Sequence, residues 1–158
     1  MKRIVLIISI GLAAMALGNT TLLAHCQIPC GIYDDHLRLT LMEEHIATIE
    51  KSMNEIVKLS ADKTANYNQL VRWIGNKDKH ADNLSELVTY YFMAQRIMPA
   101  DQNDAKNHEK YIREITLLHQ MLYHAMKTKQ TTDLEEIKKL RELLKQFQAS
   151  YLNKQAEK

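Results

Sequence analysis

From Asp35 to the end of the chain, apolar residues recur at alternating spacings of three and four, the period of an amphipathic α-helix. Four such seams follow one another, and each predicts a helix that buries one face. The first seam consists of Leu39, Met42, Ile46, Ile49, Met53 and Ile56. The second, interrupted by Lys77, consists of Tyr67, Leu70, Ile74, Ala81, Leu84, Val88 and Tyr91. The third consists of Tyr111, Ile115, Leu118, Leu122 and Ala125, and the fourth of Ile137, Leu140, Leu144, Phe147 and Tyr151.

Polar residues and a proline mark where the first two predicted helices begin and end. Asp34 or Asp35 can cap the first helix, and Asp62, just past the end of the first seam, can cap the second. The second helix runs through Gly75, because the seam continues beyond that glycine. It ends before Pro99, since proline disfavours the helical conformation in the residue before it.

The third and fourth predicted helices are separated by residues 128–132. Thr132 and Glu135 have the spacing of a capping box at the start of the fourth helix. Short links between long helices favour antiparallel neighbours. The sequence therefore predicts an all-α fold, an up-down-up-down four-helix bundle over residues 35–158.

The first 24 residues have a different pattern. Lys2 and Arg3 precede an apolar run over residues 4–17, and Ala24 ends a segment typical of a secretory signal peptide. The apolar run is shorter than the roughly 20 residues of a membrane-spanning helix. We therefore predict that residues 1–24 are removed by a peptidase and that the protein is exported to a periplasmic or extracellular space, with no membrane contact after processing.

Composition and charge argue against several classes of fold and function. Four Gly and two Pro in 158 residues leave little material for the turns of an all-β fold. Without Lys2 and Arg3, the chain has 19 basic and 19 acidic residues, so its charge gives no reason to expect nucleic-acid binding. The six histidines beyond residue 35 are scattered and lack the Glu-x-x-His spacing of di-iron bundles.

Residues 25–33 carry the densest chemistry, His-Cys-Gln-Ile-Pro-Cys-Gly-Ile-Tyr. After cleavage, His25 offers an α-amine and an imidazole. Cys26 offers a backbone amide nitrogen and a thiolate, and Cys30 a second thiolate. The amine of His25 and the amide of Cys26 form a five-membered chelate ring, so these residues can supply two nitrogens and two sulfurs to one metal. Pro29 and Gly31 suit the turn that returns Cys30 to it.

Planar coordination by nitrogen and sulfur suits Ni(II) or Cu(II), whereas zinc prefers a tetrahedron. Anionic sulfur and amide donors stabilise a higher oxidation state, which indicates a redox site. The spacing alone leaves open an exported Ni- or Cu-binding bundle without enzyme activity, and also a thiol–disulfide protein that uses Cys26 and Cys30.

The whole string resembles the metal-binding hook of the nickel superoxide dismutases. The matching positions are His25, Cys26, Pro29, Cys30, Gly31 and Tyr33, immediately after a processing site. The pair Tyr91-Phe92 and the helical order of the rest are also similar to that family. The resemblance implies an enzyme that converts superoxide to dioxygen and hydrogen peroxide by Ni(III)/Ni(II) cycling, with one nickel ion per chain.

The resemblance also assigns roles. His25 would supply the amine and an axial imidazole, Cys26 the amide nitrogen and a thiolate, and Cys30 the second thiolate. Tyr33 would stand over the open axial face. An acidic and a basic residue on the first two helices support the imidazole in some relatives, for which the candidates are Glu43, Glu44 and Arg72, and Tyr91 is a further candidate near the metal.

Members of that family are homohexamers, which implies a homo-oligomer here. Some relatives carry a shorter prosequence that is removed in the cytoplasm, so a cytoplasmic enzyme is the alternative to export. The expected organisation is a removed segment at 1–24, a nickel-binding hook at 25–34 and the helical bundle at 35–158.

Overall fold

The computed structural model describes residues 34–62, 64 and 66–152. Its elements are α2 (Asp35–Ala61), α3 (Tyr67–Glu86), η1 (Leu87–Arg96), α4 (Ala105–Gln130) and α5 (Glu135–Leu152). All of them are helical, which confirms the predicted all-α class. Within the described residues, no helix is both long enough and apolar enough to cross a membrane.

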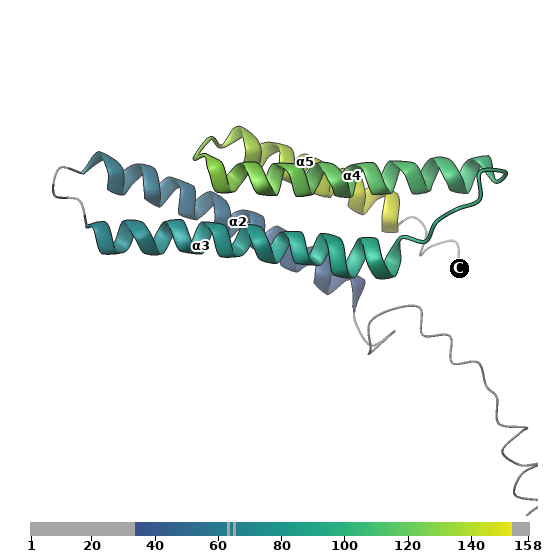
Figure 1. The fold of residues 1–158 in the computed structure, drawn as a ribbon, viewed down its shortest axis with the longest axis horizontal. Coiled ribbons are helices and arrows are strands. Elements are labelled where there is room, and N and C mark those ends of the chain that lie inside the picture. Colours follow the sequence, from purple (N-terminus) through teal and green to yellow (C-terminus); the bar gives the residue numbers. More distant parts are fainter. Residues whose placement is uncertain (1–33, 63, 65, 153–158) are drawn as a thin grey trace, which may run out of the picture. The chain divides into compact units, whose positions relative to one another are not determined.

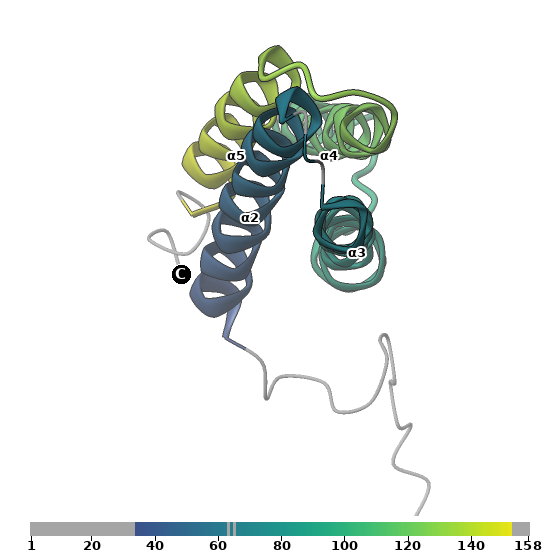
Figure 2. The ribbon, with the colours of Figure 1, turned by 90° about the vertical axis from the view of Figure 1, so that its left-hand side faces the viewer.

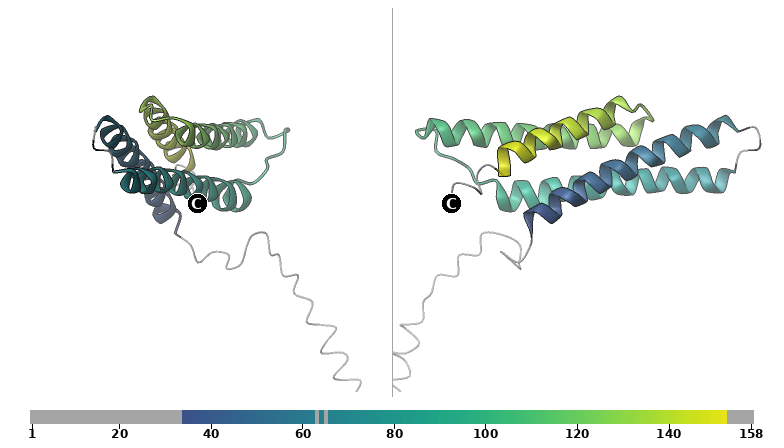
Figure 3. Two further views of the ribbon diagram at one scale, coloured as in Figure 1. Left: turned by 60° about the vertical axis from the view of Figure 1, so that its left-hand side comes forward. Right: turned by 180° about the vertical axis from the view of Figure 1, so that it is seen from behind.

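The helices form two antiparallel hairpins packed against each other (Figure 1). α2 packs on α3 and α5, and α4 packs on α3 and α5, so each helix contacts the two that are adjacent in an up-down-up-down bundle (Figure 2). α3 passes through Gly75 and continues into η1, as the second seam predicts. Seen from behind, α2 crosses the bundle obliquely (Figure 3). The predicted four-helix bundle is therefore confirmed.

The first and fourth seams were predicted correctly. Every apolar residue of the α2 seam and of the α5 seam is buried. One part of the core is aromatic: the Phe92 ring meets the rings of Phe147 and Tyr151 edge to face, at centroid distances of 5.0 and 5.5 Å. Such edge-to-face contacts add to the burial energy of the rings. This aromatic group joins η1 to α5.

The prediction that the second seam is buried was wrong for its first half. Tyr67 and Ile74 are 74% and 40% exposed, whereas Ala81, Leu84 and Val88 are buried. Figure 1 shows the reason: the loop between α2 and α3 extends well beyond the loop between α4 and α5. The first turns of α3 therefore have no second hairpin to cover them.

Two of the predicted helix starts lie later than expected. Asn66, and not Asp62, caps α3, since its side-chain oxygen accepts from the Gln69 amide at 3.2 Å. Asp62 instead follows the end of α2 and accepts from the Thr64 amide at 2.8 Å.

The break between α4 and α5 is also displaced. α4 continues to Gln130, so Thr128 is a buried helical residue and not part of the connection. The Asp133 carboxylate accepts a hydrogen bond from the Glu135 amide at 2.9 Å. This bond takes the place of the Thr132 capping box that the sequence suggests. In both stretches several residues could cap the helix, so the sequence places the helix start only to within a few residues.

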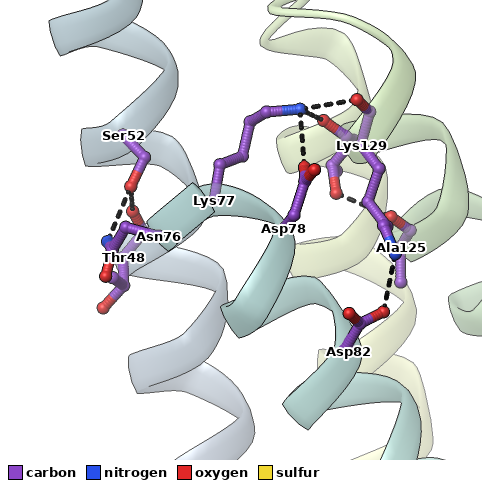
Figure 4. A network of polar contacts seen from close by, with 9 residues as sticks. Thr48, Ser52, Asn76, Lys77, Asp78, Asp82, Ala125 and Lys129 are labelled. Atoms are coloured by element: carbon purple, nitrogen blue, oxygen red, sulfur yellow. Dashed lines mark hydrogen bonds and ion pairs between the residues drawn. The ribbon is translucent and has the colours of Figure 1, made fainter. Parts of the chain in front are cut away.

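Lys77, the interruption of the second seam, is a buried side chain that joins the two hairpins. It is 4% exposed. Its ammonium donates to the carbonyl oxygens of Thr128 and Lys129 at 2.5 and 2.7 Å and lies 3.3 Å from a carboxylate oxygen of Asp78 (Figure 4). These carbonyls belong to the last turn of α4, where backbone acceptors lack helical partners and a cation is favoured.

We expect Lys77→Met to lower the free energy of unfolding by about 2 kcal/mol, because it leaves buried carbonyls without a charged donor. Lys129→Met is the matched control, since Lys129 pairs with Asp82 on the exposed surface at 2.8 Å and should contribute at most about 1 kcal/mol. Chemical denaturation followed by circular dichroism measures both. Equal effects of the two substitutions would show that Lys77 does not cap α4.

Candidate metal centre

The four residues predicted to form the metal site, His25, Cys26, Cys30 and Tyr33, lie outside the described residues, which begin at Asp34. Their roles stay predictions from the sequence. Within residues 34–152, as far as they are described, no group of three His, Cys, Asp or Glu side chains could hold a metal ion. What the structure shows is the part of the bundle into which the predicted hook leads.

The chain enters the bundle through the first turn of α2. The Asp34 carboxylate caps this helix, accepting from the backbone amides of His36 and Leu37 at 2.8 and 3.4 Å. This confirms one of the two predicted caps. Asp35, the other candidate, has a different role and faces η1 and α5.

The Asp35 carboxylate is the centre of a polar cluster. Its Oδ1 accepts from the Tyr91 hydroxyl and lies 2.8 Å from Nε of Arg96. Its Oδ2 accepts from the Tyr151 hydroxyl at 2.7 Å. Arg96 Nη2 also donates to the Tyr91 oxygen at 2.9 Å. The beginning of α2 is thereby joined to η1 and to the end of α5, and we call these four residues the Asp35 cluster.

The π-helical geometry of η1 places Arg96 beside Tyr91. In an α-helix, residues five apart point about 140° away from each other. In a π-helix they are hydrogen-bonded neighbours, and the Ile97 amide donates to the Phe92 carbonyl at 2.9 Å at the end of η1. The Arg96 guanidinium therefore lies over the Tyr91 ring, 4.9 Å from its centroid.

The cluster is electrically complementary. Burial by itself would raise the pKa of Asp35, but hydrogen bonds from Tyr91 and Tyr151 and the charge of Arg96 hold that pKa below its usual value. Burial and the bond to Asp35 both raise the pKa of Tyr151. Asp35 is thus ionised at neutral pH, both phenols keep their protons, and each phenol donates its proton to the carboxylate.

Arg38 adds a second positive charge at this end of the bundle. Its guanidinium lies 5.3 Å from the centroid of the Tyr91 ring, within the range of a cation–π contact. Tyr91 therefore meets one guanidinium from α2 and one from η1. The cluster is in contact with the aromatic core, because the Phe92 ring meets the rings of Tyr91 and Tyr151 at centroid distances of 5.1 and 5.5 Å.

The structure does not bring together the helical residues that the resemblance suggested as supports for the imidazole. Glu43, on α2, accepts a hydrogen bond from Nε2 of Gln148 on α5, and its Oε1 lies 2.8 Å from that nitrogen at the surface of the bundle. Arg72 is exposed and precedes Tyr91 by about 28 Å along the same helical course. The acid and base that meet where the hook enters are Asp35 and Arg96.

Sequence reasoning missed these partners for identifiable reasons. Asp35 was read only as a capping residue, and Tyr151 only as an apolar seam position. Arg96 lies off the seam at the α-helical period and reaches Tyr91 only through the π-helical turns. The one available signal was the Tyr91-Phe92 pair, which placed Tyr91 among the candidates.

The scattered histidines that interact within the bundle have protein partners. His45 and His80 face each other with Nδ1 atoms 3.0 Å apart, and His124 Nδ1 lies 2.6 Å from Glu136. Burial and the neighbouring His80 both lower the pKa of His45. These side chains connect helices within the bundle.

Comparison with known proteins identifies the family of the chain. The family model described as nickel-containing superoxide dismutase matches residues 20–155, which covers the candidate hook and the whole described bundle. No curated protein and no solved structure gives a significant match. The chain belongs to the nickel-containing superoxide dismutase family, and it is therefore an oxidoreductase that acts on superoxide and uses nickel.

Proposed function

We propose that the processed chain, beginning at His25, holds one nickel ion through His25, Cys26 and Cys30. Bound there, nickel supplies a one-electron Ni(III)/Ni(II) couple that oxidises one superoxide to dioxygen and reduces a second, with two protons, to hydrogen peroxide. The observation that carries the proposal is the string of residues 25–33 inside the span that matches the family model.

The donor set fits nickel. Two thiolates are soft, strongly donating ligands, and an amine next to a deprotonated amide adds two nitrogens in one chelate ring. The His25 imidazole is available as a further nitrogen ligand. A hard cation such as Mg²⁺ would prefer oxygen donors, which these three residues do not provide.

The proposed role of Tyr33 is to control what reaches the metal. Its phenol can order water and restrict access without being a ligand. An outer group of this kind tunes a metal site and does not hold the ion. Tyr33 directly precedes Asp34, the residue that caps α2.

Nickel analysis with a dismutase assay on the processed protein tests this function. We expect one nickel per chain and dismutase activity that depends on it. Stoichiometric zinc after nickel loading would contradict the proposal. Nickel without activity would favour a metal-binding bundle, and a Cys26–Cys30 disulfide without metal would favour a thiol–disulfide protein.

Export and processing belong to the same proposal. Removal of residues 1–24 by a maturation peptidase exposes the α-amine that the site requires, and the segment has the pattern of a signal peptide. Mass spectrometry of the protein from a periplasmic or culture fraction should show an N-terminus at His25. Recovery only from the cytoplasm would instead support the alternative of a cytoplasmic prosequence.

We also propose a homo-oligomer, a hexamer by family resemblance. Exposed apolar side chains gather near the loop between α2 and α3, where the second hairpin does not reach: Val57, Tyr67, Val71 and Ile74. Three of them follow one another on a single face of α3 at helical spacing. Exposed apolar stripes typically mark protein interfaces. Light scattering of the nickel-loaded protein tests this, and a monomeric mass would contradict it.

A further inference from the structure

We propose that Asp35 is a positioning residue for the metal-binding segment: it anchors the first turn of α2 to η1 and α5, and so fixes the point from which residues 25–33 leave the bundle. This role rests on the proposed function. The proposed role of Asp35 is that of an anchor and not of a ligand. Its effect on nickel passes through the backbone that it anchors.

The connection is short. Asp35 follows Cys30 by five residues, which span at most about 18 Å when fully extended. A movement of the first turn of α2 therefore moves the origin of the segment that must return Cys30 to the metal. A chelate formed by residues near a chain terminus gains affinity when its attachment is held in one place beforehand.

The first turn of a helix needs such an anchor. Its amide groups lack partners within the helix and helix ends fray. Asp34 satisfies two of these amides, but its contacts are local to α2. The tertiary bonds come from Asp35, whose two carboxylate oxygens are engaged by groups of η1 and α5.

The cluster sets a geometry in addition to any stability it contributes. A partly buried ion pair can specify one arrangement of the elements that it joins, and here it joins the first turn of α2 to η1. The ten residues of η1 are π-helical. Such turns are rare in proteins, and those that occur are often found at functional sites. The π-helical turns are what bring Arg96 to Asp35.

The hydrogen-bond directions predict how the cluster fails. The Tyr91 hydroxyl donates to Asp35 and accepts from Arg96, and Tyr151 donates to the other carboxylate oxygen. In Asp35→Asn, one oxygen becomes an NH₂ group, which faces a hydroxyl or guanidinium donor and cannot accept from it. The substitution keeps the size of the side chain and breaks part of the anchor.

The test compares four variants of the processed full chain, Asp35→Asn, Asp35→Glu, Tyr151→Phe and Lys77→Met, with the unchanged protein. Asp35→Asn removes the charge, and Tyr151→Phe removes a single hydrogen bond and no charge. Lys77→Met is the control, because it breaks a buried polar link between the hairpins. Lys77 lies about 20 Å from Tyr91 along α3 and η1. Nickel affinity is measured by competition with a chromophoric chelator. The absorption bands of thiolate-bound nickel and the helical circular dichroism are recorded for each.

We expect Asp35→Asn to bind nickel roughly tenfold more weakly, within the range seen when outer partners of a metal site are lost. Its thiolate–nickel bands should shift while its helicity is retained. Tyr151→Phe should show a smaller change in the same direction, and Asp35→Glu should restore part of the affinity. Lys77→Met should lower stability but leave affinity and bands unchanged.

Unchanged affinity and bands in folded Asp35→Asn would overturn the positioning role. If that variant does not fold, unchanged binding by Tyr151→Phe would overturn it instead. Equal losses in Lys77→Met would also overturn it, because the effect would then follow stability and not position. Failure of the unchanged protein to bind nickel would overturn the proposed function itself, a result distinct from the other three.

Discussion

A chain that carries one extra alanine before His25 is expected to be helical, soluble and inactive as a dismutase. The additional peptide bond converts the α-amine of His25 into an amide. An amide nitrogen has a poor lone pair and holds its proton tightly, so the first chelate ring loses its terminal donor. The first apolar seam of the sequence begins at Leu39, and therefore folding should not depend on this position.

Activity should fall more than about 100-fold, because a direct donor is lost and even outer partners of a metal contribute roughly 10- to 100-fold. The matched control carries the extra alanine after Lys158, at the other end of the chain. Circular dichroism and nickel analysis accompany the assay. Full activity of the N-terminally extended protein would show that the amine is not a ligand, and the hook interpretation would be wrong.

Replacement of either cysteine by serine is expected to abolish nickel binding and activity together. Serine offers a hard oxygen with a high pKa where the proposed site needs a soft thiolate. Nickel per chain, measured on Cys26→Ser and Cys30→Ser after loading, should fall to background. Gln27→Ser is the control, since Gln27 lies in the same segment and is not a proposed ligand.

The fold of both cysteine variants should be unchanged. Both cysteines precede the four apolar seams of the sequence, the first of which begins at Leu39. Unfolding curves that match those of the unchanged protein would confirm this. A large loss of helicity in either variant would mean that the cysteines form a structural link.

Local sequence determined the fold class and most of the bundle. The seams of α2 and α5 predict the buried residues correctly, because an amphipathic helix at the 3.6-residue period has one apolar face wherever it packs. The hook prediction is equally local. Its proposed donors lie within nine consecutive residues, and the chelate chemistry proposed for them depends on covalent neighbours more than on the fold.

Tertiary structure decided which side chains are buried where the two hairpins meet. Tyr67 and Ile74 have the period of core residues but are exposed, because the α4–α5 hairpin does not reach them. Lys77 reads as an interruption of its seam, yet it is buried, because the unpaired carbonyls of the last turn of α4 lie beside it.

The Asp35 cluster depends on the same long-range effects. It unites residues separated by up to 116 positions, and it needs π-helical turns that no hydrophobic period predicts. The sequence by itself predicted the metal-binding residues and determined which helices form. Only the packed bundle decided which polar side chains meet at the first turn of α2, which follows the metal-binding segment. Such contacts depend on how the ends of the helices pack on one another.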